Sequence, residues 1–439
     1  MERKDAENEL LNRAGISNPV QIFTTKAQAG LFKEMMPIFY DKSGSWWLWN
    51  EEKFKWVLVD EVDILNMIEK STGQDVITPK NRTLILNSLK QEGRKLTPKP
   101  IKTTWIQFKD KIFDIETGET FTASPEYFVT NPIPWELNSE KVECTQNMDR
   151  IFEEWVGKDN VRLLYEILAY CLLPDYPIHR LFCLVGAGLN GKGKFLILLS
   201  RFLGSENVTA TELDTLINSR FEVTRLYKKL VCQMGETNFN ELNKTSVLKK
   251  LTGQDLIGFE YKNKTPFEDM NYAKILIATN NLPSTTDKTV GFYRRWLIID
   301  FPNQFSEEKD ILAEIPEEEY SCLALKCCSI LHDLLKVRKF TNEGTIEQRA
   351  EKYESKSNFL EKFIKESTTT ADVDGYITIA DFNKKFWSWC KENRHREMSE
   401  TSLGMAMKKL GHEQARKYFT WLFDGKGGTL RCWMGITWK

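Results

Sequence analysis

The chain has 439 residues, of which 41% are hydrophobic and 28% charged, and its formal net charge is −1. This mixture is typical of globular proteins, and the length is enough for about two to four domains. A membrane-spanning helix is excluded, because no run of about eighteen apolar residues occurs. The polar N-terminus does not fit a signal peptide, so we expect a cytoplasmic protein.

Nine scattered cysteines without CxxC pairs and only four histidines give no evident zinc site. We therefore expect buried, reduced thiols, as is usual inside cells.

Residues 1–145 are predicted to form a mixed α+β N-terminal domain. Apolar and aromatic strands flank short polar loops in 46–59 and again in 104–115, which is the pattern of two β-hairpins. The tryptophans of these hairpins are expected to pack in a core, with stacking on nucleic-acid bases as the alternative.

The middle of the chain is predicted to be helical and then α/β. Residues 146–180 form a helical collar segment, because their apolar residues recur at helical spacing. In 181–305 apolar strands alternate with helices, the pattern of an α/β layer. Residues 306–370 are expected to be helical, with helices at about 307–336 and 345–366.

The tail, residues 371–439, is predicted to be a winged-helix-like module that binds DNA or a partner. Two helices precede a hairpin; Ser399 is a candidate N-cap and Gly411 a candidate helix end. From Tyr376 to Lys439 there are 12 Lys and Arg and 6 Asp and Glu, a net charge of +6. This excess favours an acidic partner.

The most specific motif is a glycine-rich loop between an apolar strand and a helix-like run. Its residues are Gly186, Ala187, Gly188, Leu189, Asn190, Gly191 and Lys192, followed by Gly193 and Lys194. This context predicts a phosphate-binding loop, in which backbone N–H groups surround the β- and γ-phosphates and Lys192 neutralises their charge. Gly193 stands where such loops usually have the Ser or Thr that binds magnesium, so water or another group must hold the metal.

Polar side chains also adjoin three further predicted strands. Glu236 follows one of them and is the candidate general base and metal-side carboxylate. Asn280 follows another and is placed to bond the γ-phosphate or the attacking water. Arg294 and Arg295 precede a third, and arginine suits the charge on a transferring phosphoryl group.

The order of the loop, Glu236, Asn280 and the arginine pair resembles that of superfamily 3 helicases. Within them it is most similar to the helicase part of phage and plasmid primase-helicases and of the poxvirus primase-helicase. The resemblance implies a DNA-binding hairpin in the central channel of a hexamer, with Lys262, Asn263 and Lys264 at its tip. It also favours Arg295 over Arg294 as the arginine finger that enters the neighbouring subunit.

The fold that this resemblance implies is α/β: an AAA+-type P-loop ATPase core with the N-terminal domain, the helical collar and the winged helix around it. The implied cofactors are ATP and Mg²⁺. The implied activity is that of a replicative DNA helicase of a virus or plasmid, which hydrolyses ATP and moves on DNA as a homo-hexameric ring. Its partners would be single-stranded and duplex DNA but no membrane, and its location the host cytoplasm if viral.

Two departures from the family concern magnesium: Gly193 lacks the hydroxyl, and Gly235 stands where many relatives have a second acid. Relatives often carry an upstream primase-polymerase domain, whose active-site pattern is not found in residues 1–145. The chain is therefore either the helicase part of a longer polypeptide or acts beside a separate primase or polymerase.

Two rival functions stay open on the sequence alone. One is an initiator or packaging ATPase that remodels duplex DNA without processive unwinding. The other is a nucleotide-gated DNA-binding module that does not hydrolyse ATP, for which Gly193 and Gly235 are the best arguments.

Overall fold

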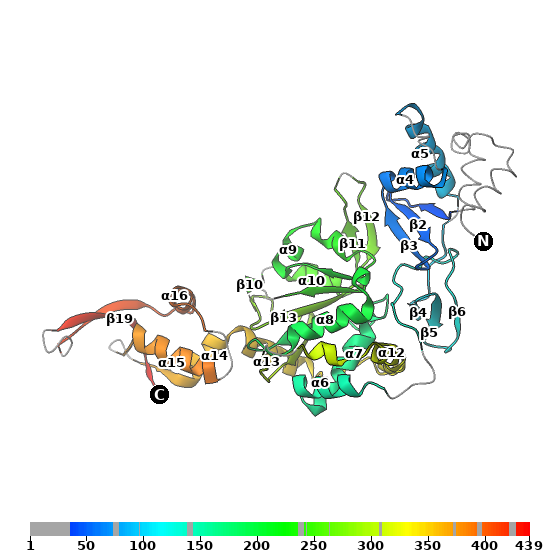
Figure 1. Cartoon of the computed structure of the whole chain (residues 1–439). Coiled ribbons are helices and arrows are strands. Elements are labelled where there is room, and N and C mark those ends of the chain that lie inside the picture. The colour runs from blue at the N-terminus through cyan, green and yellow to red at the C-terminus, as the bar shows by residue number, and fades with distance from the viewer. Residues whose placement is uncertain are drawn as a thin grey trace, which may run out of the picture.

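The computed structural model of the chain describes residues 36–439 except 73–78, 96, 138–143, 236–240, 243, 263, 307–309, 372–374, 393–396 and 421–426. Residues 1–35 of the predicted N-terminal domain lie outside the described residues. Figure 1 shows a β-rich N-terminal part, a central part around a parallel sheet, and a C-terminal part at the far end. Within the described ranges, no helix has the length and apolar character needed to cross a membrane.

The first predicted hairpin is confirmed as part of a three-stranded antiparallel sheet. Its strands are β1 (Ile38–Tyr40), β2 (Trp46–Asn50) and β3 (Lys55–Val59), in that order. The helices α4 (Glu61–Thr72) and α5 (Pro79–Gly93) follow. The tryptophans of this hairpin are at most 6% exposed, so they lie in the core as expected and offer no open face to a base.

The second predicted hairpin is also confirmed, with one strand more than expected. Its strands are β4 (Trp105–Phe108), β5 (Lys111–Asp114) and the additional β6 (Thr120–Thr122). The buried Gln107 donates from Nε2 to the carbonyl of Phe54 at 2.6 Å, which joins this sheet to the first hairpin.

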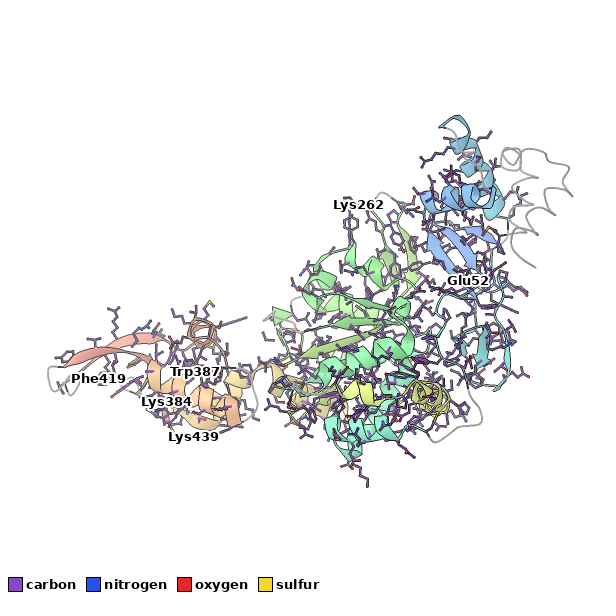
Figure 2. The ribbon with its side chains drawn as sticks, in the orientation of Figure 1. Glu52, Lys262, Lys384, Trp387, Phe419 and Lys439 are labelled. Carbon is purple, nitrogen blue, oxygen red and sulfur yellow. A yellow bond between two sulfur atoms is a disulfide. The ribbon has the colours of Figure 1, made fainter. Side chains whose placement is uncertain are left out.

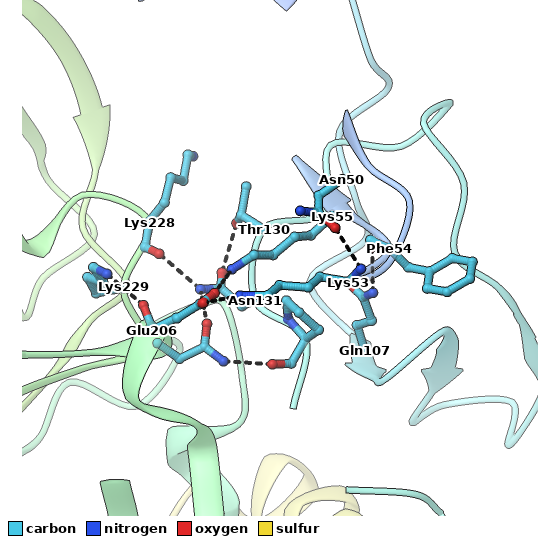
Figure 3. A network of polar contacts seen from close by, with 12 residues as sticks. Asn50, Lys53, Phe54, Lys55, Gln107, Thr130, Asn131, Glu206, Lys228 and Lys229 are labelled. Atoms are coloured by element: carbon cyan, nitrogen blue, oxygen red, sulfur yellow. Dashed lines mark hydrogen bonds and ion pairs between the residues drawn. The ribbon is translucent and has the colours of Figure 1, made fainter. Parts of the chain in front are cut away.

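A polar network attaches the N-terminal part to the central part (Figure 3). Lys53 and Lys55 both contact the carboxylate of Glu206. Asn131 donates to the carbonyl of Lys228 at 2.9 Å. Hydrogen bonds from the two lysines lower the pKa of Glu206 to about 2. Because Glu206 is half exposed, each ion pair contributes little stability alone, and the network mainly fixes the orientation of the two parts.

The central part is built on a five-stranded, fully parallel sheet with the order β15-β7-β13-β9-β8. Its strands are β7 (Leu181–Val185), β8 (Val208–Ala210), β9 (Val231–Met234), β13 (Lys274–Thr279) and β15 (Trp296–Asp300). Every residue of β7 and β13 is buried, as expected for a parallel sheet that is covered on both faces. The predicted α/β layer is thus confirmed as a mixed α/β structure with a parallel sheet, and the C-terminal ends of its strands meet at one edge.

Helices cover the two faces of this sheet through separate apolar clusters. Phe182 and Leu184 of β7 pack with the helices α6 (Gln146–Val156), α7 (Val161–Cys171), α8 (Lys192–Leu203) and α12 (Glu317–Val337). Leu181 and Cys183, which point the other way along the same strand, pack with α9 (Leu213–Asn218), α10 (Thr245–Leu251), α11 (Val290–Tyr293) and α13 (Ile346–Ser357). A small parallel pair, β10 (Glu241–Leu242) and β14 (Ser284–Thr285), lies beside the sheet.

The helices after the core differ from the prediction at two points. The helix expected from about residue 307 begins at Glu317, the first residue of α12. The single helix expected over 345–366 is wrong, because α13 ends at Ser357 and α14 (Phe359–Ser367) starts after Asn358. Asn358 leaves the helical conformation with φ −118°, and its side-chain amide donates to Glu354 Oε2 at 2.7 Å.

The expectation that all nine cysteines are reduced is wrong for two of them. A disulfide joins Cys144, which precedes α6, to Cys322 in α12, with their Cα atoms 5.9 Å apart. The seven other cysteines are free and buried. Burial raises the pKa of Cys171 to about 12, which keeps this thiol protonated and unreactive.

The order helix, helix, hairpin predicted for the tail is confirmed. Its elements are α15 (Ile379–Glu392), α16 (Glu400–Lys409), β18 (Gln414–Phe419) and β19 (Gly428–Met434). Ser399 caps α16 by accepting the N–H of Ser402 at 3.2 Å, and Gly411 has φ +85° just beyond its end. The first hairpin strand starts at Gln414.

Three short strands of the tail were not predicted: β16 (Thr368–Thr370), β17 (Tyr376–Thr378) and β20 (Ile436–Trp438). The strand β17 pairs with β19, which gives the sheet order β17-β19-β18.

Candidate nucleotide and DNA site

The predicted phosphate loop connects the C-terminal end of β7 to the N-terminus of α8. Its backbone needs glycine at two points. A side chain at Gly191, which has φ +89°, would collide with the indole of Trp155. A Cβ at Gly186 would lie 2.6 Å from the carbonyl oxygen of Phe301. The close packing of Trp155 and Phe301 therefore fixes the path of the loop.

Lys192 is the best-defined side chain of the loop. It is 6% exposed, and its Nζ donates to the carbonyl of Gly186 at 2.6 Å and to Asn190 Oδ1 at 3.0 Å. The same Nζ contacts Asn280 Oδ1 at 3.2 Å. Asn280 directly follows β13, the neighbour of β7 in the sheet. The structure thus brings together two of the predicted catalytic residues, 88 positions apart in the chain.

The outer side of the loop is open. Ala187, Leu189 and Gly193 are exposed, and a Cβ added at Gly193 would have no other heavy atom within 4 Å. The N–H of Phe195 donates to the carbonyl of Gly191 at 2.8 Å, which is the first hydrogen bond within α8. As in any helix, the N–H groups before it have no partner within the helix itself. An open glycine loop, a helix N-terminus and a buried lysine fit the phosphates of a nucleotide.

A cavity of about 390 Å³ lies beside the loop, lined by Glu154 and the segment 302–305. The N–H of Phe305 bonds the carbonyl of Leu189 at 2.7 Å, which fixes this cavity against the loop. A pocket of this size is within the range of small-ligand sites.

Two cations that the sequence reasoning missed lie at the same edge of the sheet. Lys352 and Lys356, one turn apart on α13, contact the two carboxylate oxygens of Asp300 at 2.8 and 2.9 Å. Asp300 ends β15 beside Val185, the residue before the loop. Burial alone would raise the pKa of Asp300, but the two lysines outweigh it and hold this pKa below its usual range. The sequence signal for these two cations was a pair of lysines four residues apart. It could not identify their partner, because Asp300 lies more than fifty residues earlier in the chain.

The residues expected to handle magnesium are only partly described. Glu236, the candidate base and metal-side carboxylate, lies outside the described residues, and so does Thr237. Among the residues that the structure does describe, no group of three or more His, Cys, Asp or Glu is placed to hold a metal. Mg²⁺ usually binds nucleotide enzymes through phosphates, water and one or two protein groups, so this loop fits a nucleotide-borne magnesium. Lys194, predicted to bind nucleotide, directs its Nζ to Asp310 at 2.7 Å.

The predicted DNA hairpin is present in the described part of the core. Its strands are β11 (Leu256–Phe259) and β12 (Phe267–Met270), paired antiparallel. Lys262 and Lys264 lie exposed at its tip, and Figure 2 shows Lys262 at the outer end of the hairpin. Asn263, between them, lies outside the described residues.

Aromatic residues at the tip end of the two strands hold the loop of this hairpin. The rings of Phe259 and Phe267 stack at 5.6 Å, and Tyr227 packs against Phe267 at 4.8 Å. These aromatic contacts hold the loop end of the hairpin, while the two lysines remain in solvent.

The preference for Arg295 as the arginine finger does not agree with the structure. Arg295 is 7% exposed, and its guanidinium donates to Thr252 Oγ1 at 2.9 Å and to the carbonyls of Gly291 and Lys249. These contacts hold it inside its own chain, beneath the DNA hairpin. Arg294 is the exposed member of the pair. Of the two arginines before β15, Arg295 therefore has a structural role, and Arg294 is the one that could reach a neighbouring subunit.

Two family matches fall on the regions described above. Residues 29–158 match a family described as "D5 N terminal like". Residues 184–295 match DUF5906, a family of unknown function. The second match spans the glycine-rich loop, the hairpin of β11 and β12 and both arginines.

A viral protein is similar to much of the chain. A protein of Acanthamoeba polyphaga mimivirus named "Putative helicase L207/L206" is 22% identical over 327 residues, which cover 66% of this chain and 33% of the viral protein. The chain therefore spans about a third of the length of this relative.

Two solved structures match nearly the whole length of the chain. The apo structure of the NrS-1 C-terminal region is 14% identical with a TM-score of 0.50, and the match covers 96% of this chain and 100% of that one. An A-form apo structure of the same region is 12% identical with a TM-score of 0.47, over 95% and 99% of the two chains. The first of these shows a shared fold. Separately, the D5-like segment and the viral relative support a relationship of this chain to viral helicase-like proteins.

Proposed function

We propose that this chain is an ATP-driven DNA helicase motor of the superfamily 3 type, with an AAA+-type P-loop core, that acts in viral or plasmid replication. The observation that carries the proposal is the meeting of Lys192 and Asn280 at the edge of the parallel sheet, beside an open glycine loop. There the ammonium group of Lys192 and the side-chain amide of Asn280 lie at the proposed binding position of the terminal phosphate. The viral relative and the D5-like segment support a replication function of the helicase or primase-helicase kind.

In the proposed reaction, backbone N–H groups of the loop hold the β- and γ-phosphates while Lys192 moves from the carbonyl of Gly186 onto a phosphate oxygen. Asn280 then orients the attacking water or the γ-phosphate, and Glu236 accepts the proton of that water. Mg²⁺ bound with ATP supplies positive charge to the phosphates. Attack on the γ-phosphorus releases ADP and inorganic phosphate.

The position of the arginines supports the proposed ring. Arg294 precedes β15, whereas the phosphate loop lies beyond the other end of this strand. Five residues of parallel strand span about 16 Å. Arg294 is thus too far from the loop of its own chain to stabilise the transferring phosphoryl group, and it would serve the site of a neighbour in a homo-hexamer.

Coupling to DNA is assigned to the core hairpin. Lys262 and Lys264 at its tip can hold backbone phosphates as point charges without reading the bases, as a motor that moves along any sequence requires. Single-stranded DNA in the channel and duplex DNA ahead of it are the proposed partners, with a primase or polymerase beside them.

The proposal is tested by strand displacement on a forked duplex with ATP and Mg²⁺, with Lys192→Ala as the inactive control. Displacement by the wild type alone supports it. ATP hydrolysis without displacement would instead favour an initiator or packaging ATPase. Binding of ATP without hydrolysis would favour the nucleotide-gated module for which Gly193 and Gly235 argue.

A further inference from the structure

The C-terminal ribbon of β18 and β19 is a second basic feature, distinct from the core hairpin. The two strands pair antiparallel from Gln414 opposite Trp433 to Phe419 opposite Gly428. Figure 1 shows the ribbon extending away from α15 and α16 at the end of the molecule opposite to the N-terminal part. It is therefore accessible along much of its length.

The register places two arginines directly opposite each other. Arg416 of β18 pairs with Arg431 of β19, and both side chains are exposed. Directly opposite side chains on one face of an antiparallel pair have Cβ atoms about 4.5–5.5 Å apart, and like charges in this position destabilise the sheet. Within the described residues, no carboxylate forms an ion pair with either guanidinium. An unfavourable pair of this kind is explained if an anion from outside the chain binds it.

The same face continues with further exposed residues toward the tip. Tyr418 is 63% exposed and pairs with the exposed Thr429. We call Arg416, Tyr418, Thr429 and Arg431 the outer ribbon face.

The opposite face of the ribbon packs inward. There Lys417 lies 4.2 Å from the ring of Tyr376, and Cys432 is buried. The charges of the outer ribbon face are therefore not a consequence of packing.

We propose that the outer ribbon face binds the phosphate backbone of duplex nucleic acid. A guanidinium presents a planar fork of donors that matches phosphate oxygens, and two adjacent guanidiniums can hold neighbouring phosphates of one strand. A two-stranded ribbon also has the dimensions that the major groove of B-DNA admits. Tyr418 near the tip adds an aromatic surface for a sugar or a base edge.

The neighbouring helix is less suited to this task. The exposed positions of α16 include Glu400 and Met405 as well as Lys408 and Lys409. A carboxylate and an apolar side chain among the lysines weaken attraction to phosphates. The outer ribbon face, whose charged residues are Arg416 and Arg431, is the stronger surface of this part.

The ribbon lies in a different part of the chain from the phosphate loop, so its binding of duplex is independent of ATP. This separates the inference from the proposed motor function. Failure of ATP hydrolysis would leave the ribbon untouched, and loss of ribbon binding would leave basal hydrolysis intact.

The test uses the full chain without nucleotide and a fluorescent duplex of about three helical turns. Anisotropy at several salt concentrations compares the wild type with Arg416→Gln/Arg431→Gln. The matched control is Lys384→Gln/Lys391→Gln, which removes two exposed charges from α15. We expect affinity to fall roughly tenfold in the ribbon variant and the log–log salt slope to flatten by about 1.8, because two phosphate contacts are lost. The control should change little.

Thermal melting provides a second readout. Removal of a like-charged cross-strand pair should leave the melting temperature unchanged or slightly higher. A folded ribbon variant with unchanged affinity and salt slope would overturn the proposal. So would poly-glutamate that displaces duplex as effectively as unlabelled duplex of equal charge, since the surface would then accept any polyanion.

Discussion

The two edges of the parallel sheet hold buried cations in different ways. At the C-terminal edge, Lys192 bonds oxygens of an open loop and the side chain of Asn280. At the N-terminal edge, Lys274 bonds the carbonyls of Leu173 and Asp175, and Arg295 bonds two carbonyls and a threonine. The cations at both edges have hydrogen-bond acceptors within the chain. At the C-terminal edge these acceptors lie beside exposed backbone that a ligand can reach, whereas at the N-terminal edge they do not.

The difference teaches that burial of a cation does not by itself mark a functional site. Lys274 and Arg295 join elements that are distant in the chain, and a ligand would have to break the fold to reach them. Lys192 can leave its present oxygens for a phosphate while the loop keeps its path through Gly191 and Trp155. Changes at the first edge should therefore alter chemistry, and changes at the second edge should alter stability.

The largest effect is expected for Lys192→Ala, which should abolish ATP hydrolysis without loss of the fold, because Lys192 is the cation that bonds the inner side of the loop. Steady-state phosphate release and circular dichroism measure the two outcomes. Lys194→Ala is the matched control, since Lys194 pairs with Asp310, and it should keep most of the turnover. Wild-type hydrolysis by Lys192→Ala would refute the phosphate-loop assignment.

Arg294→Ala should keep ATP binding and lose hydrolysis by about 10³-fold, the effect typical of an arginine finger. Mixing it with Lys192→Ala subunits should restore part of the activity, because mixed rings contain intact composite sites. Arg295→Ala should instead lower stability by about 1–3 kcal/mol through unsatisfied buried partners. Subunits that co-assemble without any recovery would count against action in trans.

Which structural features the sequence predicts depends on how far apart in the chain the interacting residues are. The hairpins of β2–β3 and β4–β5 and the loop between β7 and α8 follow local patterns and were predicted. The break at Asn358 was not predicted, because neither Pro nor Gly marks it, although Ser357 and Asn358 are weak helix formers. The choice between Arg294 and Arg295 was also beyond reach, since Thr252 and Lys249, which bury Arg295, come from a distant segment.

The same limit applies to the ion pairs of Asp300 with two lysines and to the disulfide. Nothing local to Asp300 indicates that Lys352 and Lys356 will return to it. Cys144 and Cys322 are brought together only by the packing of α12 beside the segment that enters α6. The glycine-rich motif was therefore sufficient to predict the loop, whereas the contacts around the loop depend on tertiary packing.

A smaller effect is expected for Gly193→Ser, on the C-terminal edge. The space around Gly193 is open, so the hydroxyl should supply the missing magnesium ligand without strain. The half-maximal Mg²⁺ concentration for ATP hydrolysis should fall severalfold. Gly193→Ala adds the Cβ without the oxygen and should leave this concentration unchanged; equal values for all three proteins would rule the idea out.

A pH dependence of stability is expected at the N-terminal edge. Burial lowers the pKa of Lys274 to about 7 in the folded chain. Between pH 7 and about 10 the unfolded chain therefore binds a proton that the folded chain lacks, and stability rises with pH by up to about 1.4 kcal/mol per pH unit. Below pH 7 both states are protonated, and this dependence disappears.

Lys274→Met removes this titration and keeps the length of the side chain. Urea midpoints of the two proteins at pH 7, 8 and 9 should show the wild type gaining stability relative to the variant as the pH rises. A difference that stays constant over this range would show that Lys274 does not titrate there.

The most direct test of the central claim is the rate of ATP hydrolysis with and without single-stranded DNA, for the wild type and for Lys262→Ala/Lys264→Ala. An ATP-driven DNA motor predicts that the wild type hydrolyses ATP and that DNA stimulates it severalfold. The hairpin variant should keep the basal rate and lose the stimulation, because its phosphate loop is intact while its grip on DNA is gone. A wild type that does not hydrolyse ATP, or whose rate ignores DNA as the variant's does, would contradict the account.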